Sequence, residues 1–314
     1  METAEATTDG IASALNKRGL GYASRGELGC ALEELDRAIQ LKPEVSAFFD
    51  NRGFVRKELG DLDHAIEDFR EAVRLNPDNA VAFNNLGSAY FKRNNYQRAI
   101  DSFTQALALR PNYAEAYNNR AGAYVVVGEL ENALHDCKEA IRIQPDYTDA
   151  HYNCAVARTH MGDMDGAIAE FGRVIQAKPE FAEAYNSRGS VFSMKGMPER
   201  AIEDFDEAIR LKPGHFMAYY NRALTLSRMG ERERAIDDFS MAIILKPDCI
   251  QAFNKRGALY SEQGQFDRAI EDFDKAIQLQ PDYAEAVHNR AIAVQRKNEH
   301  AQVAGDLVRT ASQP

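Results

Sequence analysis

The chain has 314 residues, with 48 acidic and 38 basic side chains, a net charge of −10, four Cys and no Trp. This length suits about two ordinary globular domains and is too great for a small fold held by disulfides. The acidic charge argues against nucleic acid as a partner, because binding phosphates requires basic surface. No run of about eighteen apolar residues occurs, and residues 1–10 are acidic and polar, so we expect no membrane association and a cytoplasmic location.

The prolines reveal an internal repeat. A fixed period of this kind predicts an array of stacked structural repeats rather than ordinary globular domains. Eight of the ten prolines are spaced 34 residues apart, namely Pro43, Pro77, Pro111, Pro145, Pro179, Pro213, Pro247 and Pro281.

Placing the periodic proline at position 32 makes the first repeat begin at Ala12. Residues 1–11 precede the array, and we expect them to form a disordered tail. Residues 284–314 keep the first part of the pattern but lack the proline, so we expect a degenerate ninth repeat that caps the array. The eight complete repeats are 12–45, 46–79, 80–113, 114–147, 148–181, 182–215, 216–249 and 250–283.

Each repeat carries two helical stripes. Positions 4, 8 and 11 hold an aromatic residue, a Gly or Ala, and often a second aromatic residue, while positions 20, 24 and 27 hold mostly Ala, Phe and Ala. These spacings place each set on one side of an α-helix, so we expect a helix A and a helix B in every repeat. Gly at position 15 of seven repeats predicts the end of helix A, and the periodic proline predicts the end of helix B. Pro198 fits the first turn of a helix B.

This pattern, with Tyr or Phe at position 4, Gly or Ala at 8, Tyr at 11, Ala at 20, Phe at 24, Ala at 27 and Pro at 32, resembles the tetratricopeptide repeat. The resemblance covers almost the whole chain. It implies an all-α fold, an α-α superhelix in which antiparallel helix hairpins stack as a right-handed solenoid. It also implies that helix A lines a concave groove.

Charged residues recur together within the repeats. Arg at position 7 is accompanied by an acid at position 23 in seven repeats, whereas Leu86 at position 7 is accompanied by Ser102. We expect partly buried ion pairs that orient helix A against helix B more than they stabilise the fold, because desolvation offsets attraction. Solvated, unpaired side chains are the alternative. The pairs are Arg18 with Glu34, Arg52 with Asp68, Arg120 with Asp136, Arg188 with Asp204, Arg222 with Asp238, Arg256 with Asp272, and Arg290 with Asp306.

The face of helix A opposite the core carries Asn at position 5 or 6 of every repeat. A row of carboxamides can hydrogen-bond the backbone of an extended peptide. The row resembles the ladder that precedes the catalytic domain of O-linked N-acetylglucosamine transferases, a domain with no counterpart in this sequence. The alternative is that these Asn cap or space neighbouring helices. This Asn ladder comprises Asn16, Asn51, Asn84, Asn85, Asn118, Asn119, Asn153, Asn186, Asn221, Asn254 and Asn289.

Apolar residues at positions 9, 12 and 13 of the same face predict pockets that select side chains of a bound segment, because a soluble surface normally avoids such a strip. This apolar strip comprises Phe54, Phe91, Val125, Val126, Val156, Met194 and Leu224. The Asn ladder and the apolar strip together form the predicted partner-binding groove.

One group of side chains could bind a metal ion. His151 and Cys154 are three residues apart, and Cys137 lies on the preceding helix B, so three N and S ligands could meet zinc. Positions 4 and 24 belong to the core, which favours buried thiols and a core histidine instead. We therefore expect no metal site, no cofactor and no catalytic residues.

The sequence favours a non-enzymatic scaffold that binds an extended or helical segment of a partner protein. The alternatives are a self-assembling homo-oligomer that uses its terminal helices or the region of Phe48 and Phe49, and a regulatory subunit of an enzyme complex. C-terminal tails of Hsp70 and Hsp90 are unexpected partners, because position 5 never holds the Lys and position 9 never holds the Asn of a carboxylate clamp.

Overall fold

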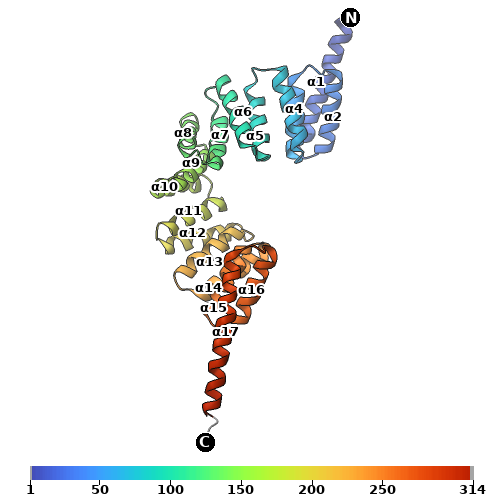
Figure 1. Cartoon of the computed structure of the whole chain (residues 1–314). Coiled ribbons are helices and arrows are strands. Elements are labelled where there is room, and N and C mark those ends of the chain that lie inside the picture. The colour runs from blue at the N-terminus through green and yellow to red at the C-terminus, as the bar shows by residue number, and fades with distance from the viewer. Residues whose placement is uncertain (1, 312–314) are drawn as a thin grey trace. The chain divides into compact units, whose positions relative to one another are not determined.

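The computed structural model describes residues 2–311 and the side chains of residues 7–303, and within them all regular structure is α-helical (Figure 1). The predicted all-α class is confirmed. None of the helices in this part of the chain is long and apolar enough to cross a membrane. The helices are α1 (Glu2–Ser24), α2 (Leu28–Leu41), α3 (Ser46–Glu58), α4 (Leu62–Leu75), α5 (Ala80–Lys92), α6 (Tyr96–Leu109), α7 (Ala114–Val127), α8 (Leu130–Ile143), α9 (Thr148–His160), α10 (Met164–Ala177), α11 (Ala182–Met194), α12 (Pro198–Leu211), α13 (Phe216–Arg228), α14 (Arg232–Leu245), α15 (Ile250–Glu262), α16 (Phe266–Leu279) and α17 (Ala284–Ala311).

The chain divides after Asp163 into two compact bodies. The N-terminal body contains α1 to α9, and the C-terminal body contains α10 to α17. In each body, helix A and helix B of a repeat pack as a hairpin, for example α3 with α4 and α15 with α16, and helix B also contacts helix A of the next repeat. The hairpins of each body are therefore stacked in sequence order, as the 34-residue period predicts.

The turn between helix A and helix B needs a left-handed residue. The glycines at position 15 have φ between +73° and +82°, and Asn94 has φ of +60° at the same position. Glycine reaches this conformation without strain and Asn tolerates it, so helix A stops there. Helix B ends two residues before the periodic proline, as Leu41 does before Pro43, because a residue before proline avoids the helical conformation. Pro198 occupies the first turn of α12, as predicted.

In most hairpins the core contains Phe at position 24, which packs against the small residue at position 8. The six Phe rings at position 24 are at most 1% exposed. A Cβ built on Gly87 would lie 2.6 Å from Cε1 of Phe103. Glycine at position 8 thus allows helix A to approach the aromatic ring of helix B closely.

The predicted ion pairs between helix A and helix B are present. Arg188 donates through Nε and Nη2 to Oδ2 and Oδ1 of Asp204 at 2.8 and 2.7 Å. The acidic partners at position 23 are buried. Arg290 bonds Asp274 instead, and the side chain of its predicted partner Asp306 lies outside the described residues. The other pairs observed are Arg18 with Glu34, Arg52 with Asp68, Arg120 with Asp136, Arg222 with Asp238, and Arg256 with Asp272.

Five of the arginines at position 7 also reach the preceding repeat. Their second partner is the residue at position 25 of the helix B before them. Where position 7 is not Arg, at Leu86 and Cys154, position 25 of the preceding repeat is basic, as Arg70 and Lys138. The observed links are Arg52 to Asp36, Arg120 to Thr104, Arg222 to Asp206, Arg256 to Ser240 and Arg290 to Asp274.

Three features differ from expectation. Residues 2–11 belong to α1 rather than to a disordered tail, because the segment contains no proline and Asp9 forms an ion pair with Lys42. Residues 284–311, expected as a degenerate ninth repeat, form the single helix α17, which continues through Asn298 although Asn94 ends helix A at the same position. Phe48 is buried in a cluster with Ala12, so its ring is not a surface for self-assembly.

The close contact at position 8 predicts that Gly87→Ala lowers the free energy of unfolding by about 1–3 kcal/mol, because the added methyl group displaces the Phe103 ring. Gly122→Ala on α7 is the control, since its Cβ meets no atom nearer than 3.8 Å and alanine favours a helix. Urea unfolding followed by circular dichroism measures both. Equal stability of Gly87→Ala and the wild type would show that the contact is not tight.

The buried acid at position 23 predicts that Arg188→Leu lowers the free energy of unfolding by about 2 kcal/mol, because Asp204 loses its bidentate partner. The double variant Arg188→Leu/Asp204→Ser copies the natural combination of Leu86 with Ser102, in which the hydroxyl donates to the Arg98 carbonyl at 2.8 Å. We expect it to recover at least half of the loss in the same urea titration. A double variant less stable than the single one would contradict the pairing.

Candidate functional site

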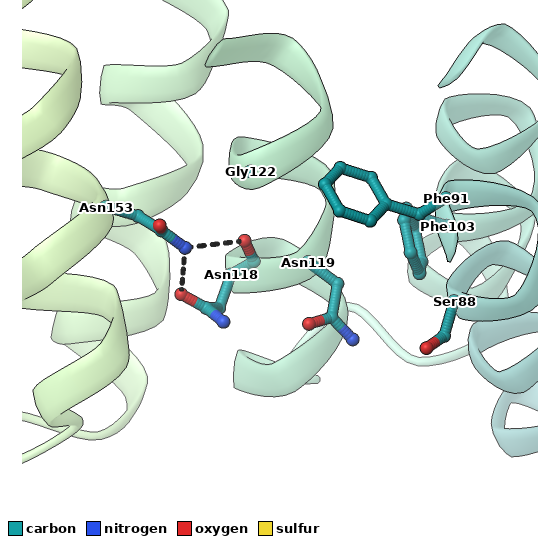
Figure 2. Close-up of a pocket in the computed structure, with 7 residues that line it drawn as sticks. All are labelled: Ser88, Phe91, Phe103, Asn118, Asn119, Gly122 and Asn153. Atoms are coloured by element: carbon teal, nitrogen blue, oxygen red, sulfur yellow. Dashed lines mark hydrogen bonds between the residues drawn. The ribbon is translucent and has the colours of Figure 1, made fainter. Parts of the chain in front are cut away.

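The Asn ladder links neighbouring repeats. At each observed rung, Asn at position 6 donates its Nδ2 to the side-chain oxygen at position 5 of the preceding repeat, over 2.8–3.0 Å. Figure 2 shows one rung, in which Asn153 donates to both the side-chain and the backbone oxygen of Asn118. The rungs are Asn51 to Asn16, Asn85 to Asp50, Asn119 to Asn84, Asn153 to Asn118, Asn221 to Asn186 and Asn289 to Asn254.

The residue types at positions 5 and 6 vary together in the sequence, as this hydrogen bond requires. Where position 5 is Tyr, at Tyr152 and Tyr220, position 6 of the next repeat is Ser187 or Lys255 instead of Asn. Asp50 replaces Asn as the acceptor in one rung. The alternative that these Asn space neighbouring helices therefore describes a real role of the ladder.

Three of the ladder Asn at position 5, namely Asn84, Asn118 and Asn254, are buried, whereas Asn16 and Asn186 are half-buried. Asn84 and Asn254, at position 5, are only 1% and 0% exposed, so their amides offer no surface to a partner. Nδ2 of Asn84 donates to Glu115 at 3.0 Å, which fixes that amide between α5 and α7. The Asn residues at position 6 are half-buried and border the open face of helix A.

Small hollows lie between successive helices A. The first, about 210 Å³, lies between α5 and α7 and reaches Asn153 on α9. The Phe103 ring of α6 forms part of its wall, beside Ser88 and Gly122 (Figure 2). The seven residues that line it are Ser88, Phe91, Phe103, Asn118, Asn119, Gly122 and Asn153.

The same hollow recurs twice in the C-terminal body. Each copy is built from positions 9, 12 and 24 of one repeat and positions 6 and 9 of the next. The hollow between α11 and α13 has about 120 Å³ and is lined by Ser190, Ser193, Met194, Phe205, Asn221, Leu224, Thr225 and Arg228. The hollow between α15 and α17 has about 160 Å³ and is lined by Ala258, Ser261, Glu262, Phe273, Asn289, Ile292 and Arg296.

The three hollows differ in charge. The first has only amide, hydroxyl and apolar groups around it. The second has Arg228, whose Nη1 donates to Oγ of Ser193 at 3.3 Å. The third combines Glu262 with Arg296. Each hollow therefore presents a different chemistry at the same place in the repeat.

The apolar strip only partly coincides with these hollows. Phe91, Met194 and Leu224 line them, whereas Phe54 and the strip valines, Val125, Val126 and Val156, lie elsewhere. The sequence did not single out Ser88, Ser190, Ser193, Gly122 or Arg228 as candidates. A small residue at position 9 over Phe at position 24 was the pattern that could have revealed the first two.

The group considered for zinc is part of the core. Cys137 and Cys154 lie in one hydrophobic cluster with Ala121. Nε2 of His151 lies 2.9 Å from the carbonyl oxygen of Pro145, a hydrogen bond that the ring donates. Among the residues that the structure describes, no three His, Cys, Asp or Glu side chains are arranged to hold a metal ion.

Asp50 is the charged rung of the ladder, and burial raises its pKa while the bond from Asn85 opposes the shift. Because its folded pKa lies above its unfolded value, Asp50 favours folding at low pH and loses that contribution as pH rises through the folded pKa. We expect Asp50→Asn, which keeps an acceptor for Asn85, to raise the free energy of unfolding by about 0.5–1 kcal/mol at pH 7 and by less at pH 4. Urea unfolding at both pH values measures the difference.

Asp50→Ala is the control for that experiment, because it removes the acceptor together with the charge. It is expected to lower stability at both pH values. If Asp50→Asn were destabilising at pH 7, burial of the carboxylate would not be the dominant effect.

Family models match most of the array. The model described as tetratricopeptide repeat matches residues 80–113, 114–147, 182–215 and 250–283, which are four of the predicted repeats. A model described as TPR repeat matches residues 53–93, and another tetratricopeptide repeat model matches residues 218–249. The comparison with curated proteins finds no match.

Solved structures share the fold. A tetratricopeptide repeat protein from Parabacteroides merdae is 21% identical with a TM-score of 0.63, over 75% of this chain and 93% of that one. A chain in the structure of the APC/C hetero-tetramer Cut9–Hcn1 is 16% identical with a TM-score of 0.66. The match covers 85% of this chain and 52% of that one, so this chain spans about half the length of that chain. The pilF protein of Pseudomonas aeruginosa is 18% identical with a TM-score of 0.60, over 68% of this chain and 96% of that one. From the period, the hairpins and the matched models, the chain belongs to the tetratricopeptide repeat family.

Proposed function

We propose that this protein is a non-enzymatic scaffold that holds an extended segment of a partner protein along the open face of helix A. Proteins built from these repeats mediate contacts between proteins. The observation that carries the proposal is the recurrence of one hollow, with an Asn at position 6 in its wall and Phe at position 24 beneath it. A surface that repeats along a chain matches a ligand that also repeats, which is a polypeptide.

The size of the hollows supports a peptide rather than a small-molecule substrate. Volumes of about 120–210 Å³ are below the roughly 300–1,000 Å³ of ordinary ligand pockets. Each hollow has room for about one side chain. An extended segment would therefore insert single side chains at intervals and leave its backbone along the helices.

The rungs of the ladder determine which backbone groups the scaffold can engage. Nδ2 of Asn119 is already used to bond Asn84, and Nδ2 of Asn221 bonds both Asn186 and Ser190. The amide oxygens are the remaining acceptors, and a backbone N–H of the partner is the matching donor. Backbone contacts of this kind do not depend on the partner's sequence.

Selectivity then comes from the walls of the hollows. The hollow beside Phe91 and Gly122 suits an apolar side chain, since no charged group lines it. The hollow beside Arg228 suits a side chain with a carboxylate or carbonyl oxygen, because a guanidinium binds such acceptors well. A segment held by the N-terminal body is accordingly expected to insert an apolar residue there, and a segment held by the C-terminal body to insert an acidic one.

The test fills one hollow with a larger side chain and leaves the hydrogen bonds between the ladder Asn residues intact. Replacing the ladder Asn by Ala would also remove links between repeats, so binding and folding could not be separated. Gly122→Leu instead fills the first hollow, since the nearest atom to its Cβ, Nδ2 of Asn153, is 3.8 Å away. Gly29→Leu on α2 is the matched control, because no atom lies within 4 Å of its Cβ.

Partners are captured from a native lysate with the wild type and both variants, after circular dichroism has shown equal helicity. We expect Gly122→Leu to reduce captured partners at least fivefold and Gly29→Leu to leave them unchanged. Identical capture by all three proteins would place binding outside the first hollow and contradict the proposal there.

A further inference from the structure

The last helix A has a face that resembles a binding surface. In the other hairpins, positions 4, 8 and 11 of helix A are covered by helix B of the same repeat, as α15 is covered by α16. α17 starts as a helix A but continues as one helix to Ala311. Figure 1 shows its C-terminal half extending beyond the hairpin of α15 and α16, so residues 299–311 do not fold back over this face.

The uncovered face is apolar and exposed. Val287, at position 4, is 46% exposed, and Ala291, at position 8, is also exposed. The equivalent residues one repeat earlier, Phe253 and Gly257, are buried. This difference in exposure shows which apolar surface of helix A is buried by helix B in a complete repeat.

Arg290, the charged residue at this face, is more exposed than most arginines at the same position and has fewer acidic partners among the described side chains than Arg222. The Arg290 side chain is 43% exposed, whereas the equivalent residues with a repeat on both sides, Arg52, Arg120, Arg188, Arg222 and Arg256, are 15–22% exposed, and Arg18 in the first repeat is 55% exposed. Arg222 bonds Asp206 of the preceding helix B and Asp238 of its own helix B. Arg290 bonds Asp274, the equivalent of Asp206, through Nε, the atom that in Arg222 bonds the acid of its own helix B.

We propose that Val287, Arg290, Ala291 and Val294 form a docking site for an amphipathic helix of a partner protein. The partner helix carries the stripe found in most complete repeats: a small residue, then an acid followed by Phe or Leu, then a second small residue. In α16 these residues are Ala269, Asp272, Phe273 and Ala276. The acid pairs with Arg290 and the large residue packs on Ala291. This site is separate from the helix A groove, so neither proposal depends on the other.

The probe is a fluorescein-labelled synthetic peptide of residues 264–281, which contains the α16 stripe, added to the full chain and followed by fluorescence anisotropy. We expect saturable binding. Ala291→Glu is expected to weaken it at least tenfold, because the new carboxylate occupies the seat of the Phe ring and repels the acid. Ala301→Glu, an equal change at an exposed position of the same helix, is expected to leave binding unchanged.

A second peptide, with Asp272→Arg and Phe273→Ala, is expected to bind at least tenfold more weakly than the first. Absence of saturable binding overturns the proposal, including the case in which residues 299–311 of the chain occupy the face themselves. Equal weakening by Ala291→Glu and Ala301→Glu also overturns it. So does concentration-dependent dimerisation of the chain alone that Ala291→Glu abolishes, because the occupant is then a second copy.

Discussion

The stacking of this protein depends on the arginine at position 7, because one guanidinium contacts three helices. Arg222 extends from α13, donates to Asp238 on α14 over 2.7 Å, and donates to Asp206 on α12 over 2.5 Å. The first contact sets helix A against helix B, and the second sets one repeat against the previous one. Desolvation reduces the net gain, since burial raises the pKa of Asp272 despite the bond from Arg256. The arginine is therefore more important for orientation than for stability.

Two links cross several of the boundaries between repeats, and they start from adjacent positions of helix A. One joins position 7 to position 25, and the other joins Asn at position 6 to the acceptor at position 5. In an array whose repeats contact only their neighbours, such links fix the geometry of each junction. The hollows are a consequence, because they open between two helices A whose separation the links hold constant.

The sequence predicted the features that repeat with a simple chemical reason. The prolines fixed the period, the glycines at position 15 fixed the turns, and Arg with its acid at position 23 predicted contacts that the structure contains. These features are local, or they join two positions of one repeat.

What sequence reasoning missed involves partners in different repeats. The Asn residues were interpreted as one exposed row, whereas Asn84 is buried beneath Asn119 and accepts its hydrogen bond. The pairing of position 7 with position 25 joins two repeats, and its signal in the sequence is the basic Arg70 that precedes Leu86. The hollows were missed because they arise from small side chains such as Gly122, and the strip was chosen for large ones. The residue at position 15 does not predict the uninterrupted α17, because the helix continues through Asn298 whereas Asn94 ends one.

The most direct test of this account is a pair of double-mutant cycles on Arg222, one with Asp238 and one with Asp206, measured by urea unfolding of alanine variants. The account predicts coupling energies of about 1–2 kcal/mol with Asp238 and about 0.5–1 kcal/mol with Asp206, because Asp206 is the more exposed acid. Native-state hydrogen exchange of α12 and α13 would show loss of protection on both sides of the boundary when the link to Asp206 is removed. A coupling energy of zero with Asp206 would contradict the claim that this arginine ties neighbouring repeats together.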